Sequence, residues 1–284
     1  MHTISIESRI IRKVTLNGIS EKEDQLAIEE PLEMQISFLE HHKRIQKSVS
    51  ITMRTPGHDD ELATGFLFTE GIIQNKEQIK AVKSSVLDEN KVVVTLTDTE
   101  TPALKSLERN FYTTSSCGVC GKASIDAIKT ISMYSELEDD VTITKQVLFK
   151  LPALLQKQQE IFKSTGGLHA SALFDADGNF IALREDVGRH NALDKVIGSA
   201  FYNDQLPLTN TVLLLSGRAS FELIQKANMA GIRIVAAIGA PSSLAVELAE
   251  EFDITLIGFL GNDRFNIYSG SQRIVSDFLQ INKV

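Results

Sequence analysis

Residues 211–260 read TVLLLSGRASFELIQKANMAGIRIVAAIGAPSSLAVELAEEFDITLIGFL, and this stretch decides the fold. Three uninterrupted apolar runs alternate with two segments whose apolar residues recur at helical spacing. Strands that lack polar alternation are typical of a parallel sheet covered on both faces. The stretch therefore predicts a β-α-β-α-β core, with strands over 211–215, 232–238 and 255–260 and helices over 221–229 and 243–251.

The rest of the chain predicts a mixed fold around this core. Strands are predicted over 32–39 and 48–54, a helix over 59–71, hairpins over 82–96 and 169–183, and further helices over 124–133, 151–162 and up to residue 200. We expect an α/β protein with a smaller N-terminal α+β domain (1–135) and a C-terminal three-layer α/β/α domain (136–284). The acidic run 135–140 is the expected junction, although a solvated surface loop explains it equally well.

Composition limits the classes of function. With 284 residues, 43% hydrophobic and 23% charged, the chain has the make-up of an ordinary globular protein. No stretch approaches the roughly 20 apolar residues of a membrane-spanning helix, and residues 1–9 lack the apolar core of a signal peptide. We therefore expect a cytoplasmic protein without a membrane partner. A net charge of −8 argues against a nucleic-acid partner, but a pocket of arginines can still hold phosphates.

The only two cysteines, Cys117 and Cys120, form a C-x-x-C pair in the glycine-containing loop 113–122. In a reducing cytosol both are thiols at rest. A structural role fits poorly, because Gly118 and Gly121 make a poor rigid scaffold. A thioredoxin-like dithiol fits poorly too, because no short βαβ unit surrounds the pair. A mobile sulfur-handling loop fits best, since Lys122 and a following helix start would lower a thiol pKa.

Ligands of open α/β sheets bind beyond the carboxyl ends of the strands, and four loops are predicted there. Each contains glycine and three contain arginine, which predicts a pocket for a phosphorylated ligand, most simply a nucleotide. Asp186 or Asp263 would then read a guanine edge or a ribose. The alternative is that Ser216 and Ser242 only cap helices and the arginines pair with surface acids. The four loops are 184–191, 216–220, 239–243 and 261–266, and none is a Walker loop or a G-x-G-x-x-G fingerprint.

His169 is either an ordinary strand histidine or part of a site. A zinc deaminase would show H-x-E followed by P-C-x-x-C. Here the glutamate is missing and the C-x-x-C comes first, so deamination is disfavoured. A zinc site made of Cys117, Cys120, His169 and His190 is a minor alternative, because its ligands come from distant segments.

Six stretches resemble the FdhD family, the formate dehydrogenase accessory sulfurtransferases. They are ELATGFLFTEGI (61–72), SSCGVCGK (115–122), GGLHASA (166–172), REDVGRHNALDK (184–195), SGRASFE (216–222) and GFLGNDRFNIYS (258–269). Singly the C-x-x-C is unspecific, but in this order the set is highly specific. The resemblance implies a homodimer whose C-terminal domain is similar to the cytidine deaminase fold without its zinc chemistry.

The resemblance also implies a sulfur relay. A cysteine desulfurase would load sulfur on Cys117 as a persulfide, with Cys120 as the assisting thiol. The sulfur would pass to the bis-molybdopterin guanine dinucleotide cofactor of molybdenum or tungsten, carried as cargo and without a permanently bound metal, before insertion into the formate dehydrogenase apo-enzyme. By match, the cofactor-binding stretch is Phe259, Leu260, Gly261, Asn262, Asp263 and Arg264, and the predicted pocket adds Ser216, Gly217, Arg218, Arg189 and His190.

Two other functions remain open. A non-catalytic chaperone would bind the molybdenum cofactor and dock on the apo-enzyme without carrying sulfur. A dithiol reductase would cycle a reversible Cys117–Cys120 disulfide at cytosolic potentials. The exposed cysteine pair favours the relay over a pure chaperone, which has no need of it.

Overall fold

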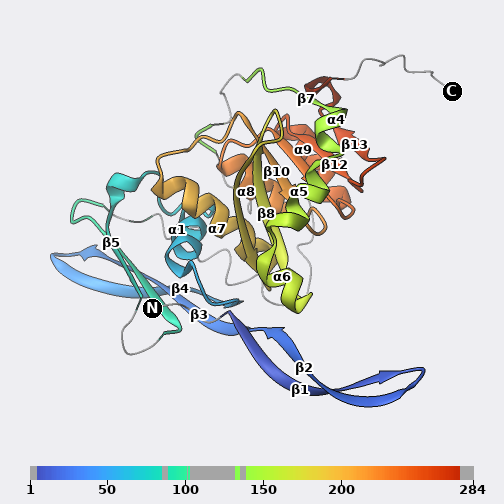
Figure 1. Ribbon diagram of the computed structural model, residues 1–284. Helices are drawn as coiled ribbons and strands as arrows, with labels where there is room; N and C mark the ends of the chain where they lie inside the picture. Colours follow the sequence, from blue (N-terminus) through green and yellow to red (C-terminus); the bar gives the residue numbers. More distant parts are fainter. Residues whose placement is uncertain (1–4, 85–88, 101, 103–131, 135–138, 276–284) are drawn as a thin grey trace. The chain divides into compact units, whose positions relative to one another are not determined.

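The computed structural model describes residues 5–84, 89–100, 102, 132–134 and 139–275 (Figure 1). The chain forms two compact units and passes between them several times. Unit 1 comprises residues 1–130, 159–170 and 184–204, and unit 2 comprises residues 131–158, 171–183 and 205–284. The expected boundary at residues 135–136 falls outside the described residues and stays a prediction. The helix expected over 124–133 lies largely outside them as well.

Unit 1 contains a four-stranded sheet in the order β4-β3-β6-β5. The predicted strands are confirmed, and they are longer than expected: β3 spans Glu30–Glu40 and β4 spans Lys43–Arg54. His41 and His42 turn the chain between them with left-handed backbones (φ 48° and 62°), the geometry of a tight hairpin turn. The hairpin expected over 82–96 is confirmed as antiparallel β5 (Ile79–Ser84) and β6 (Lys91–Leu96), with residues 85–88 outside the described set.

Two helices of unit 1 cross in close contact at a pair of glycines. They are α1 (Asp59–Thr69) and α7 (Arg189–Tyr202), and a 3₁₀ turn, η1 (Lys76–Gln78), follows α1. A Cβ on Gly65 would lie 1.9 Å from the Asp194 carbonyl oxygen, and one on Gly198 would lie 1.9 Å from that of Glu61. Only glycine allows these backbones to approach so closely. The helix predicted after residue 58 is confirmed as α1. Gly71, with a left-handed backbone (φ 71°), follows its C-terminal end as expected.

Unit 1 also carries a hairpin that the sequence analysis did not predict. Strands β1 (Ile6–Thr15) and β2 (Gly18–Ala27) pair over ten residues each, and they form the dark-blue ribbon of Figure 1. Most of their side chains are exposed, so the segment lacks the alternation of buried and exposed residues that marks a strand on a core.

The helix expected over 151–162 is two helices, which corrects the prediction. α5 (Leu151–Gln158) ends before Gln159, and α6 (Glu160–Thr165) begins after it. The break coincides with the change from unit 2 to unit 1. The carboxylate of Glu185 starts the new helix, since its oxygens accept hydrogen bonds from the backbone N–H groups of Ile161 (2.9 Å) and Phe162 (2.8 Å).

Unit 2 contains a six-stranded sheet in the order β13-β12-β11-β10-β8-β9. The predicted β-α-β-α-β core is confirmed, and its three strands are parallel. They are β10 (Thr211–Leu215), β11 (Ile234–Ala237) and β12 (Thr255–Gly258), connected by α8 (Phe221–Met229) and α9 (Ser243–Glu251).

The sheet as a whole is mixed, which corrects the expectation of a parallel sheet. β8 (His169–Asp175) is antiparallel to β10, and β13 (Asn266–Ser269) is antiparallel to β12. β9 (Phe180–Asp186) returns beside β8 as the predicted hairpin. The protein is thus a mixed α/β fold. Its three-layer arrangement and its likeness to cytidine deaminase stay predictions.

An ion cluster centred on the buried Arg273 stabilises the end of unit 2, and of its two acidic partners Asp139 is buried and Asp253 is exposed. Arg273 contacts Asp139 through both Nε and Nη2 (3.0 Å each) and Asp253 through Nη2 (2.6 Å). Asp139 is therefore a buried partner, which corrects the solvated-loop alternative at this residue. The cluster lies beside the short parallel pair β7 (Ile143–Thr144) and β14 (Ile274–Val275), with α4 (Lys145–Leu148) and η2 (Ser271–Arg273) adjoining in sequence.

Candidate functional site

The predicted sulfur-carrying residues are not among those that the structure describes. Cys117, Cys120 and Lys122 all lie within 103–131. Among the described residues, no group of three or more His, Cys, Asp or Glu side chains is placed to hold a metal ion. The four-ligand zinc alternative stays untested, because two of its ligands are these cysteines.

Three of the four predicted loops meet at one edge of the unit 2 sheet. They follow β10, β11 and β12, and we call them the strand-end loops. The first two are 216–220 and 239–243 as predicted, and the third, predicted over 261–266, is the connection 259–265 because β13 begins at Asn266. The Gly239 N–H donates to the Gly217 carbonyl (2.9 Å), and the Phe259 N–H donates to the Gly239 carbonyl (3.1 Å). Backbone bonds thus join the three loops, as the rule for open sheets predicts. A Cβ on Gly239 would lie 2.9 Å from the Gly217 oxygen, so this close contact requires glycine.

The third of these loops contains the matched stretch Phe259–Arg264 as a tight connection between β12 and β13. Phe259 has a left-handed backbone (φ 53°), which is unusual for a bulky residue, and the residue is 48% exposed. Asn262, Asp263 and Arg264 are also exposed. Leu260 differs, since its side chain is buried and its N–H donates to the Ala237 carbonyl (3.0 Å). Leu260 therefore anchors the turn while its neighbours face solvent.

The two helices that leave this edge begin with serine. Ser220 and Ser242 are the N-caps of α8 and α9. The Ser242 hydroxyl accepts a hydrogen bond from the Ala245 N–H (3.2 Å), so the helix-cap interpretation holds for this residue. Arg218, which precedes α8, is exposed.

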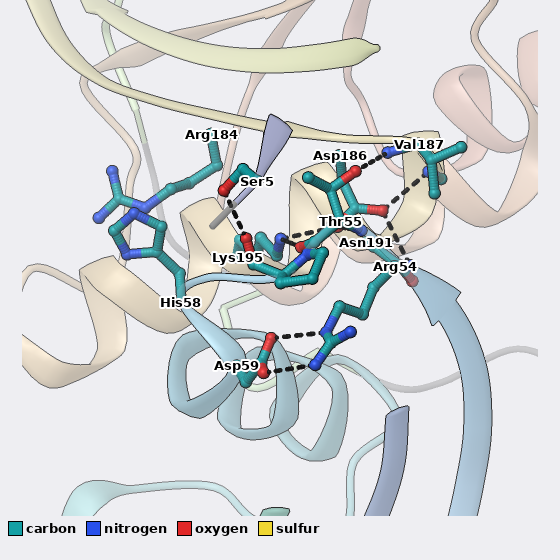
Figure 2. Close-up of polar contacts among 12 residues, drawn as sticks. Ser5, Arg54, Thr55, His58, Asp59, Arg184, Asp186, Val187, Asn191 and Lys195 are labelled. Carbon is teal, nitrogen blue, oxygen red and sulfur yellow. Dashed lines mark hydrogen bonds and ion pairs between the residues drawn. The ribbon is translucent and has the colours of Figure 1, made fainter. Parts of the chain in front are cut away.

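The fourth predicted loop belongs to unit 1 and surrounds a buried carboxylate (Figure 2). Asp186 is fully buried, and its Oδ2 lies 2.7 Å from the Lys195 Nζ and accepts from the Thr55 N–H (3.2 Å). Its Oδ1 accepts from the Gly188 N–H (2.8 Å) and from Asn191 Nδ2 (3.1 Å). The acceptor sites of this carboxylate are occupied, so Asp186 cannot read a guanine or a ribose. That expectation is corrected, and of the two candidates Asp263 remains.

The same residues connect two distant parts of the sequence. Lys195 donates to the Thr55 carbonyl (2.8 Å), and Asn191 Nδ2 donates to the Met53 carbonyl (2.8 Å). We call Asp186, Lys195, Asn191 and Thr55 the Asp186 network. It holds the start of α7 against the end of β4, and Figure 2 shows these side chains converging on Asp186.

The start of α7 presents the predicted Arg189 and His190 in its first turn. The Arg189 Nε is buried and has no hydrogen-bond partner among the described residues. Burial lowers the pKa of His169, and the nearby charges of Arg189 and His190 lower it further, against the opposing effect of Asp186. His169 therefore interacts electrostatically with Arg189, His190 and Asp186.

A second polar cluster in unit 1 was missed from the sequence. Arg184 contacts Glu61 through Nε (2.6 Å) and Nη2 (2.7 Å), and His58 Nδ1 lies 3.3 Å from the same carboxylate. Burial would raise the pKa of Glu61, but the hydrogen bonds from Arg184 and His58 outweigh it and lower the pKa to about 2. Arg184 is thus occupied by Glu61, which corrects its expected role in a phosphate pocket.

The neighbouring Arg54 is occupied as well. Its Nε and Nη2 bind both oxygens of Asp59 at 3.0 Å, the parallel pair of dashed lines in Figure 2. Gly57 (φ 114°) and His58 (φ 57°) lie between Arg54 and Asp59 in the sequence, and both have positive φ angles. The acidic residues in the first turn of α1 are a sequence signal that arginines bind there, but the sequence does not tell which arginines these are.

Comparison with known proteins identifies the family to which this chain belongs. The model of the FdhD/NarQ family matches residues 27–275, most of the chain. The chain belongs to the FdhD/NarQ family. It is 48% identical over 273 residues to "Sulfur carrier protein FdhD" of Mycolicibacterium paratuberculosis, covering 94% of this chain and 97% of that protein. It is 44% identical over 276 residues to the protein of the same name from Streptomyces coelicolor, covering 94% and 95% of the two chains.

A solved structure agrees with the fold. The crystal structure of a protein assigned as a formate dehydrogenase accessory protein, from Desulfotalea psychrophila, superposes on this FdhD/NarQ family member with a TM-score of 0.71. The match covers 96% of this chain and 100% of the other at 20% sequence identity, so it supports the fold alone. No helix within the described residues is both long and apolar enough to cross a membrane.

Proposed function

We propose that this chain is a sulfur carrier that supports the maturation of formate dehydrogenase. The observation that carries the proposal is its 48% identity, over nearly the full length of both chains, to a protein named sulfur carrier. The only cysteines of the chain form a C-x-x-C pair, which suits that role. We further propose a cysteine desulfurase as donor, apo-formate dehydrogenase as recipient, and a cytoplasmic homodimer as the active form.

The proposed chemistry has two steps. In loading, the Cys117 thiolate attacks the outer sulfur of the donor persulfide, and the donor leaves as a thiolate. In delivery, the Cys120 thiolate attacks the Cys117 sulfur, and the outer sulfur leaves as sulfide. The two electrons that reduce this sulfur come from the two cysteines, which end as a disulfide. A cellular dithiol reductant then restores both thiols.

The proposed recipient is the bis-molybdopterin guanine dinucleotide cofactor, which is cargo and not a resident group. The strand-end loops suit the guanine nucleotide for three reasons. Arg218 and Arg264 are exposed cations for phosphate oxygens. The exposed Phe259 ring offers a surface for stacking on a flat base. Asp263 offers an exposed carboxylate that can accept the N–H donors of a guanine edge.

Loading is tested by intact-protein mass spectrometry after incubation with a cysteine desulfurase and cysteine. We expect the wild type to gain one sulfur and Cys117→Ala to gain none, whereas Cys120→Ala still loads but fails to deliver. No gain in the wild type would contradict the relay. Activation of formate dehydrogenase by Cys117→Ser would instead support a cofactor chaperone that carries no sulfur.

Nucleotide binding is tested by titration with GDP. We expect Arg264→Ala to weaken GDP binding roughly tenfold, the effect of losing one charge-assisted contact, while persulfide loading is unchanged. Arg9→Ala, which removes an exposed arginine of the β1–β2 hairpin, is the matched control. Unchanged affinity in Arg264→Ala would remove this residue from the proposed pocket.

A further inference from the structure

The β1–β2 hairpin exposes an apolar stripe on one of its two faces. Alternate residues of a strand point to the same side, so Ile10 and Val14 share a face, and the ladder places Ile19 directly opposite Val14. These three side chains are 70%, 70% and 71% exposed. We call them the hairpin apolar face, and Figure 1 labels the two strands, β1 and β2, that carry them.

The opposite face of the hairpin differs. Ile11 and Asp24 point to that side and are only partly exposed, and α6 lies against β2. The fold therefore supports the hairpin from one side and, within the described residues, leaves the hairpin apolar face uncovered. An isolated two-stranded ribbon is only marginally stable in water, and exposed apolar surface on a strand pair marks an interaction site.

Charge identifies the partner. On the face that carries these apolar residues, β1 presents Arg12, whereas β2 presents Glu21 and Glu23. The other charged residues of the hairpin point to the opposite face. The face with the apolar residues is therefore basic on one strand and acidic on the other. When two such ribbons stack face to face about a two-fold axis parallel to their strands, β1 of each lies over β2 of the other. A second copy thus supplies both the apolar stripe and the complementary charges.

We propose that the hairpin apolar face binds the same face of a second copy of this chain. At this contact Arg12 of each copy meets Glu21 of the other, since the two residues are cross-strand neighbours on the apolar face. The proposal names the surface of the homodimer in the proposed function and rests on it for the oligomeric state. Its test measures the molecular mass of the protein in solution. The result therefore does not depend on whether the protein transfers sulfur.

The first experiment measures the mass of the full chain by light scattering at low micromolar concentration. We expect a dimer for the wild type and at least a tenfold weaker dimer for Val14→Asp. Lys13→Asp is the matched control, because it makes a larger change of charge on the neighbouring residue of the opposite face. A monomeric wild type, or a Val14→Asp protein that dimerises like the wild type, would overturn the proposal.

A second experiment exchanges charges and still tests the proposal if Val14→Asp fails to fold. Arg12→Glu and Glu21→Arg each place like charges at both contacts of the stacked pair, so each protein alone should dimerise at least tenfold more weakly. An equimolar mixture places opposite charges at both contacts and should form heterodimers, detected by native mass spectrometry. Repulsion within each hairpin is the same in the mixture, so recovery reports contact between chains. Absence of recovery would sink the face-to-face arrangement.

Discussion

The Asp186 network in unit 1 and the strand-end loops in unit 2 are both held by dense hydrogen bonding, but different groups make the bonds. In the network, charged side chains are buried and bind one another and the backbone. In the strand-end loops, backbone groups bind one another, and Arg218, Asp263 and Arg264 stay exposed. The first arrangement leaves little capacity for a ligand, whereas the second holds a rigid backbone and leaves its side chains free to bind.

The largest expected effect tests whether the network is structural. Lys195→Met removes the partner of the fully buried Asp186, so we expect a loss of about 3–5 kcal/mol in the free energy of unfolding. The double variant Asp186→Asn with Lys195→Met should recover part of this loss, because no buried charge remains. Urea unfolding measures both values. A Lys195→Met protein as stable as the wild type would show that the pair contributes nothing.

The next effect concerns pH. The pKa of Glu61 falls from its ordinary value of 4.5 to about 2 in the folded state. Its stabilising contribution is therefore fully present above pH 4.5 and is lost as the pH falls toward 2. Unfolding free energies measured across this window should fall less steeply in Glu61→Gln than in the wild type. Parallel curves would mean that Arg184 and His58 do not hold this carboxylate.

A smaller effect is expected in the strand-end loops. A left-handed backbone conformation costs a bulky residue about 1 kcal/mol, and glycine adopts it without this cost. For Phe259→Gly we therefore expect the free energy of unfolding to stay level or to rise slightly. GDP binding should weaken, because the exposed ring is lost. Phe259→Leu is the control that keeps the backbone cost and removes the aromatic face. Full GDP affinity in both variants would exclude stacking on Phe259.

The smallest effect on stability is expected for Arg264→Ala. The side chain is exposed, so the free energy of unfolding should change by less than about 0.5 kcal/mol, although GDP binding weakens. Thermal unfolding of this variant and of the Arg9→Ala control should give matching midpoints. A clear loss of stability in Arg264→Ala would mean that this loop, like the Asp186 network, is built for structure.

Local sequence patterns predicted many of the described elements. The apolar runs of β10, β11 and β12 and the glycine stop after α1 act over a few residues, and all were found. The β1–β2 hairpin was missed because its exposed faces carry no core pattern. One sequence signal could have predicted that Lys195 is buried. Lys195 lies in α7 three residues after Ala192 and one before Val196, and both of these residues are buried. A lysine among buried positions requires a buried partner.

The sequence by itself determined the family motifs, the cysteine pair and the strand-end rule that gathers three loops. Only the tertiary structure decided which charged residues are free to bind. The sequence suggested that Asp186 and Arg184 bind a ligand. In the structure Asp186 binds Thr55 and Lys195, and Arg184 binds Glu61. The Thr55–Asp186 bond joins residues 131 positions apart. Helix and strand patterns act over a few residues, whereas the pairing of a buried charge depends on which distant segment the fold brings beside it.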